Sequence, residues 1–316
     1  LVGWGTFELV VMRDATVAIG QQSGAMAGAQ WPVLATLLWG GVVMLLISGS
    51  MVQLVRKLIA RIALPLVVLS LLWLSWQFLS LAQTQGFEAL WTRKGDGGMG
   101  VLPALDLVIA MPISWLPLVA DYARHGKNGG SALRGTWLGY ALANIWCYSL
   151  GVLVALTLPS QDLVQALLLA QGGLIALSLI LIDEVDNAYG DAYSGAVSAH
   201  SLLPRWSIRR WGLAVAALCT GLALVLPMHS LEPFLLLLSS VFVPLFGVIL
   251  GRLAFGTDAP ALLATARKVN AAPVAIWLAG IAVYHLAPKV LPDAGSALPA
   301  LAFSFVLAWA TRPKAR

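Results

Sequence analysis

Apolar segments of about twenty residues recur through the sequence, and each is long enough to cross a hydrocarbon core of about 30 Å. Only 10% of the 316 residues are charged, whereas a soluble globular domain carries about 25%. The sequence therefore predicts an all-α polytopic membrane protein with a single transmembrane domain. We place its spans at about 1–19, 32–52, 62–82, 101–122, 135–158, 165–198, 210–228, 231–254, 272–288 and 295–311.

The basic residues gather in alternate loops between these spans. Five such loops carry three Lys or Arg residues each, in the ranges 56–61, 124–134, 205–210, 252–268 and 312–316. The opposite loops hold Arg93, Lys94 and Lys289. Because basic residues favour cytoplasmic loops, we expect a multi-pass protein of the cell membrane with both ends of this chain in the cytoplasm.

The first span carries ionisable groups at bilayer depth, where they are costly and usually mark a pathway, a site or a tight pair. Trp4 and Glu8 are four residues apart and share one helical face. A planar ligand could stack on the indole and hydrogen-bond the carboxylate, while ordinary helix packing is the alternative for Trp4. Arg13 and Asp14 could neutralise one another or neighbouring helices, which would be a structural role.

The fourth span contains Pro112 and Pro117 at mid-membrane. Proline inside a helix removes a hydrogen bond and costs about 3 kcal/mol, so the pair predicts an interrupted helix. Discontinuous helices are the usual substrate and ion sites of secondary transporters, although a simple proline kink is the alternative. Met111 to Ser114 would offer backbone groups at the break, and Trp115 could be a second stacking surface.

The span at 165–198 holds the densest polarity, because Asp183, Glu184, Asp186 and Asp191 fall within nine residues. Helical spacing places Asp183 and Asp186 or Asn187 along one stripe, with Asp191 one turn after Asn187. These carboxylates cannot all face lipid. They would line a site within the protein if the segment is a helix, or be solvated if it is a loop.

The sequence shows no nucleotide-binding loop, nucleophile elbow or zinc helix, and its histidines form no metal-ligand pattern. These observations argue against an ATP-driven pump and against a hydrolase. We therefore expect no enzyme activity, no resident metal or cofactor and no nucleic-acid partner.

Three motifs resemble the nucleobase–cation symporter family 1, the cytosine/purine permease group: WGTFE at 4–8, SWLPLVADYAR at 114–124 and DEVDNAYGDAYS at 183–194. The likeness covers essentially the whole chain and is strongest to the hydroxymethylpyrimidine branch, which is associated with salvage of a thiamine precursor. It implies a LeuT-like fold of twelve helices with two inverted five-helix repeats. The spans found here would then be helices three to twelve, and we expect the first two helices to precede Leu1.

The resemblance also implies roles for individual residues in a site between helices one, three, six and eight. Trp4 matches the family's aromatic residue on helix three, and Glu8 replaces a polar amide. Pro112 stands where the family has an aromatic residue at the helix-six break. Asp186 and Asn187 stand where sodium-coupled members carry hydroxyl residues.

We therefore predict a monomeric, cation-coupled importer of an aminopyrimidine, either hydroxymethylpyrimidine or cytosine, that works by alternating access and contacts only its substrate and membrane lipid. The predicted substrate contacts are Trp4, Glu8, Met111, Pro112, Ser114, Trp115, Asn187 and Asp191. The predicted cation-coupling residues are Asp183, Asp186 and Asn187. The co-transported ion could be Na⁺, through oxygen ligands, or H⁺, through a carboxyl group.

Three alternatives remain open at this stage. Within the family, a purine or allantoin permease would fit the same motifs. A membrane-embedded lipid enzyme could use the carboxylates of 183–191 to hold a divalent metal, but the broken fourth span would then have no role. A receptor on the same fold would bind a pyrimidine without accumulating it.

Overall fold

The computed structural model describes residues 1–22, 24, 28–49, 61–62, 64–95, 98–123, 125–159, 163–226, 231–253 and 270–312. Among them it has α-helices, one 3₁₀ turn and no β-strand, which confirms the predicted all-α class. The elements in chain order are α1 (Val2–Gln22), α2 (Trp31–Ser48), α4 (Leu64–Gln85), α5 (Phe87–Trp91), α6 (Val101–Ile113), α7 (Leu116–Ala123), α8 (Gly129–Thr157), α9 (Leu163–Leu169), α10 (Gly173–Leu202), α11 (Ile208–Val225), α12 (Glu232–Leu253), α14 (Ala271–Val290), η2 (Pro292–Ala294) and α15 (Ala297–Ala310).

Six of the described helices, α2, α4, α8, α11, α12 and α14, are long and apolar enough to cross a membrane. The apolar helices α6 and α15 are shorter. The long helices α1 and α10 carry the ionisable residues that the sequence places at bilayer depth. Polarity is thus concentrated on two particular helices, and the chain is a multi-pass membrane protein. Residues 50–52, 63, 227–228 and 254 of the predicted spans lie outside the described residues.

The chain divides into two compact units. The first unit comprises 1–93 and 145–229, and the second comprises 94–144 and 230–316. Helix α8 therefore contributes its first half to the second unit and its second half to the first.

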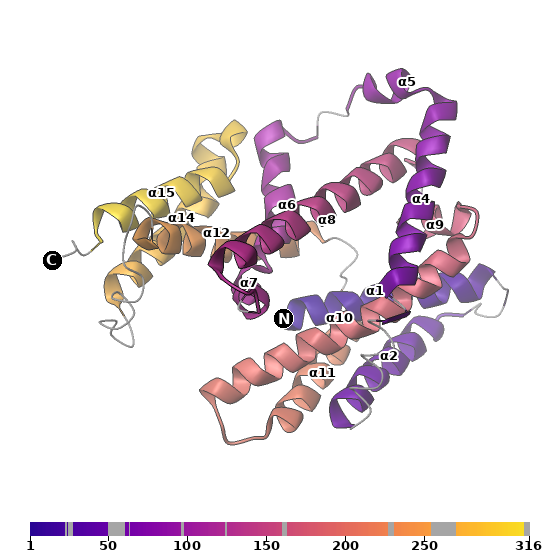
Figure 1. Ribbon diagram of the computed structural model, residues 1–316, viewed down its shortest axis with the longest axis horizontal. Helices are drawn as coiled ribbons and strands as arrows, with labels where there is room; N and C mark the ends of the chain where they lie inside the picture. The colour runs from indigo at the N-terminus through magenta and orange to yellow at the C-terminus, as the bar shows by residue number, and fades with distance from the viewer. Residues whose placement is uncertain are drawn as a thin grey trace. The chain divides into compact units, whose positions relative to one another are not determined.

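In the first unit, α10 runs alongside α1, and α1 also packs against α2, α9 and α11 (Figure 1). Leu9, Met12 and Ala15 of α1 are buried in the apolar core of this unit. At Gly5, an added Cβ would lie 3.2 Å from Cys219 Sγ and 3.6 Å from Asp191 Cβ. The small residue therefore allows α1 to lie close to both α10 and α11.

In the second unit, α12 packs against α6, α14 and α15. Ile113, Val243 and Tyr284 form its core together with alanines near the start of α15. At Gly247 on α12, an added Cβ would lie 2.8 Å from the carbonyl oxygen of Leu301. Close packing of helices against small residues is typical of membrane bundles, where lipid supplies no hydrophobic drive for association.

Two helix interruptions decide where the polar residues lie. The fourth predicted span is broken as expected, because α6 ends at Ile113 and α7 begins at Leu116. The sixth predicted span, 165–198, differs from the structure, which has α9 and α10 in its place. The break falls at Gly172, whose φ of 74° is readily adopted only by glycine.

Candidate functional site

The α1 helix brings Trp4 and Glu8 to one face of the first unit. The indole of Trp4 is half-buried and meets the ring of Phe7 edge to face, with centroids 5.9 Å apart. The side chain of Glu8 is only 6% exposed. The shared face predicted from the sequence therefore exists, and it points into the protein.

The α10 helix carries the predicted acids at different depths. Asp191 is 3% exposed, whereas Asp183 and Asp186 are half-buried and Asn187 is exposed. Tyr189 is buried and stacks on Tyr193 at a centroid distance of 5.9 Å. The acidic run is helical throughout, so the alternative of a solvated loop does not apply.

Packing of α1 on α10 places Glu8 and Asp191 in one buried region. Asp191 approaches α1 at Gly5, three residues before Glu8 and on the same helical face. Asp191 and Glu184 are the acids that act electrostatically on Glu8. Within the described chain, neither Glu8 Oε2 nor Asp191 Oδ2 has a hydrogen-bond partner. Buried polar atoms without partners are rare in native proteins and need an explanation.

Arg13 and Asp14 neutralise one another, which was one of the two structural roles expected of them. The Arg13 Nε donates to Asp14 Oδ1 at 2.7 Å. A second nitrogen of Arg13, Nη1, donates to the carbonyl oxygen of Ala223 on α11 at 3.3 Å. Arg13 therefore links α1 to α11 through a hydrogen bond, and its charge is paired with that of Asp14.

The break between α6 and α7 lies in the second unit. The Ser114 hydroxyl donates to the Met111 carbonyl at 2.7 Å. The Pro112 carbonyl accepts from the Trp115 amide at 3.2 Å and from the Tyr140 hydroxyl at 3.0 Å. These two carbonyls therefore already accept hydrogen bonds, which differs from the expectation of free backbone groups at the break.

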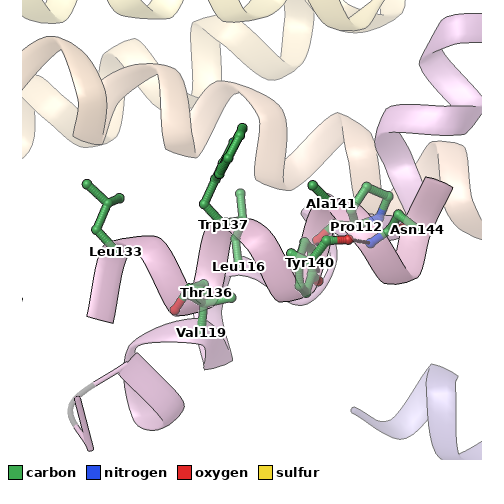
Figure 2. Close-up of a pocket in the computed structure, with 9 residues that line it drawn as sticks. All are labelled: Pro112, Leu116, Val119, Leu133, Thr136, Trp137, Tyr140, Ala141 and Asn144. Carbon is green, nitrogen blue, oxygen red and sulfur yellow. Dashed lines mark hydrogen bonds between the residues drawn. The ribbon is translucent and has the colours of Figure 1, made fainter. Parts of the chain in front are cut away.

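A cavity of about 440 Å³ lies beside this break (Figure 2). Its wall is mostly apolar, and Figure 2 shows Tyr140 of α8 reaching Pro112 through the hydrogen bond described above. Asn144 lines the cavity one helical turn after Tyr140 and donates to the Tyr140 carbonyl at 2.8 Å. The complete lining is Pro112, Leu116, Val119, Leu133, Thr136, Trp137, Tyr140, Ala141 and Asn144.

The predicted site residues fall in both units. The first unit holds Trp4, Glu8, Asp183, Asp186, Asn187 and Asp191. The second unit holds Met111, Pro112, Ser114 and Trp115. The structure thus gives two local arrangements, a buried pair of carboxyl groups between α1 and α10 and a broken helix beside a cavity.

Sequence reasoning did not single out three residues that the structure adds. Glu184 acts electrostatically on Glu8, and its place in the acidic run was the available signal. Tyr140 donates a hydrogen bond to the Pro112 carbonyl across 28 residues of sequence, and no local pattern indicates this contact. Asp106 is a third buried acid, and it accepts hydrogen bonds from the amides of Ser296 and Ala297.

The sequence model of a family described as permeases for cytosine/purines, uracil, thiamine and allantoin matches residues 3–311 of the chain. No curated protein matches the sequence.

Proposed function

Because the chain belongs to the family of permeases for cytosine/purines, uracil, thiamine and allantoin, we propose that it is a secondary active transporter that imports an aminopyrimidine. Hydroxymethylpyrimidine and cytosine are the proposed substrates, and a role in thiamine precursor salvage would follow from the first. The transporter would act as a monomer in the cell membrane, with both ends of this chain in the cytoplasm, by cation-coupled alternating access.

The observation that carries this proposal is the buried carboxyl group of Glu8 one helical turn after Trp4. An aminopyrimidine has a flat ring with an exocyclic amine beside a ring nitrogen. Stacking a base on an aromatic side chain contributes about 1–3 kcal/mol. A carboxyl group offers two oxygens to the polar edge of the same ring. Trp4 therefore suits the flat face of the ligand, and Glu8 suits its polar edge.

The broken helix of the second unit is a further candidate for contact with substrate. Transporters with discontinuous helices bind substrate and ions at the interruption, and the interruption here lies at Ser114 and Trp115. Trp115 would provide an aromatic surface at this break. Asp191 would share recognition of the amine with Glu8, and Asp183, Asp186 and Asn187 are the proposed cation-coupling residues.

Uptake of labelled hydroxymethylpyrimidine and cytosine by the intact protein in proteoliposomes tests the proposal. We expect Glu8→Ala to abolish uptake, because the variant loses both oxygens that would bind the ring edge. Glu88→Ala is the matched control, since Glu88 is exposed on α5. Unchanged uptake in Glu8→Ala would rule out the carboxylate role.

Competition by unlabelled ligands distinguishes the substrates. An excess of hydroxymethylpyrimidine or cytosine should suppress uptake of the labelled probe, whereas a purine or allantoin should not. Stronger suppression by a purine or allantoin would indicate that the substrate belongs to that class and not to the aminopyrimidines. Binding without accumulation in the same vesicles would instead favour a receptor.

A further inference from the structure

Two buried carboxyl groups of the first unit lack counter-groups among the residues that the structure describes. The side chains of Glu8 and Asp191 are 6% and 3% exposed. One oxygen of each, Glu8 Oε2 and Asp191 Oδ2, bonds to no group in the part of the chain that the structure describes. Burying an ionised carboxylate without a partner is strongly unfavourable. A proton or another cation held at the pair would remove this cost.

The described parts of the surrounding helices supply no basic side chain to the pair. The side chains that act on Glu8 are Asp191 and Glu184 of α10. From α11 the facing group is the thiol of Cys219. Helices α2 and α9 carry no ionisable residue, and Arg13 of α1 is bonded to Asp14. Among the described residues, three carboxyl groups thus lie together and no basic side chain acts on them.

We propose that Glu8 and Asp191 hold one proton between them and that this proton moves with the substrate, so that the pair couples uptake to proton movement. Two like charges close together in a protein interior favour retention of one proton, because both groups cannot easily ionise. The inference rests on the proposed function, and it concerns the coupling ion of that same site.

The chemistry of the pair suits the proposed ligand. One protonated and one ionised carboxyl group together present an O–H donor and carboxylate acceptors. An aminopyrimidine has the complementary edge, since its ring nitrogen accepts and its exocyclic amine donates. The proton would come from water on one side of the membrane and bind to one carboxyl group of the pair. That O–H group would donate a hydrogen bond to the ring nitrogen. On the other side of the membrane the proton would return to water. No other bond forms or breaks.

This proposal assigns coupling to different residues from those that the sequence suggests. Asp183 and Asp186 are half-buried and Asn187 is exposed. Their polar groups are more accessible than that of Asp191, so less free energy is lost when a group there is charged. The two assignments separate in Asp191→Asn, because coupling through Asp183 and Asp186 would leave the proton flux of this variant in place.

The test uses intact protein in proteoliposomes that contain a pH-sensitive dye, with labelled hydroxymethylpyrimidine and cytosine as probes. In sodium-free buffer, an inward gradient of about two pH units can support up to about 100-fold accumulation at one proton per substrate. We expect the wild type to accumulate a probe and to acidify the vesicle interior when the probe is added. Counterflow against unlabelled probe, without any ion gradient, measures carrier activity independently of coupling.

In Asp191→Asn we expect weaker counterflow, no accumulation above the outside concentration and no acidification by the probe. Asp293→Asn, a control at an exposed residue of η2, should keep proton-driven accumulation. If Asp191→Asn does not fold, the proton flux of the wild type still decides the matter, and Asp191→Glu should retain coupling.

Two results would overturn the inference. One is wild-type accumulation that requires a sodium gradient and moves no protons, and the other is full proton coupling in Asp191→Asn. Counterflow without proton movement contradicts only this inference. Absence of counterflow with both probes contradicts the proposed function itself.

Discussion

Each unit of the protein buries acidic side chains, but the acids are satisfied in different ways. In the second unit, Asp106 is 4% exposed and accepts from the amides of Ser296 at 2.5 Å and Ala297 at 2.9 Å. In the first unit, Glu8 and Asp191 are as deeply buried, yet one oxygen of each has no partner among the described residues. Burial of a carboxyl group therefore does not by itself mark a binding site.

The partners of Asp106 show what a structural acid looks like here. Its carboxylate lies at the N-terminus of α15, where unpaired amides and the helix dipole favour negative charge. Gly295 has a φ of 67°, and an added Cβ would lie 2.8 Å from Asp106 Oδ2. The backbone around Gly295 thus brings the two amides to the Asp106 carboxylate, which needs no ligand to satisfy its hydrogen bonds.

The largest loss of stability should follow Asp106→Ala. The substitution leaves two buried amides, those of Ser296 and Ala297, without their acceptor. Each such group costs about 1–3 kcal/mol, so the unfolding midpoint of the purified protein in detergent should fall clearly. Asp293→Ala, at an exposed acid, should leave the midpoint in place. An unchanged midpoint in Asp106→Ala would contradict the claim that Asp106 stabilises the fold.

A smaller loss should follow Gly295→Ala. A left-handed backbone costs an L-residue about 1–2 kcal/mol, and the added methyl group would also press on the Asp106 carboxylate. Gly24→Ala is the matched control, because Gly24 has a φ of 72° and no atom of the described residues lies within 4 Å of an added Cβ. The unfolding midpoint should fall further for Gly295→Ala than for Gly24→Ala. Equal shifts would mean that the contact with Asp106 contributes nothing.

The features that the sequence predicted depend on residues close together in the chain. Apolar runs predicted the helices, Pro112 predicted the break that follows it, and adjacent Arg13 and Asp14 do form their ion pair. Gly172 was a local signal as well, but the apolar residues on either side of it favoured one continuous span in place of two helices.

Contacts between distant residues could not be predicted in this way. Asp106 and Ser296 are 190 residues apart, and nothing near Asp106 indicates that the N-terminus of a later helix will satisfy it. The burial of Asp191 and the exposure of Asn187, one helical turn apart, likewise depend on how α10 packs against other helices. A single sequence gives the polar stripe, and only the packing shows which members of the stripe are buried.

The central claim is that the buried acid at Glu8 serves a ligand and does not hold the fold together. The most direct test measures hydroxymethylpyrimidine and cytosine binding to purified wild type and Glu8→Gln, together with the unfolding midpoint of the same samples. Hydrogen bonds to a charged group contribute about 1.5–3 kcal/mol, so affinity for the bound probe should fall about 10- to 150-fold. The midpoint should stay the same or rise, because the amide removes a buried acid without a partner. Unaltered binding together with a midpoint that falls as in Asp106→Ala would contradict the claim.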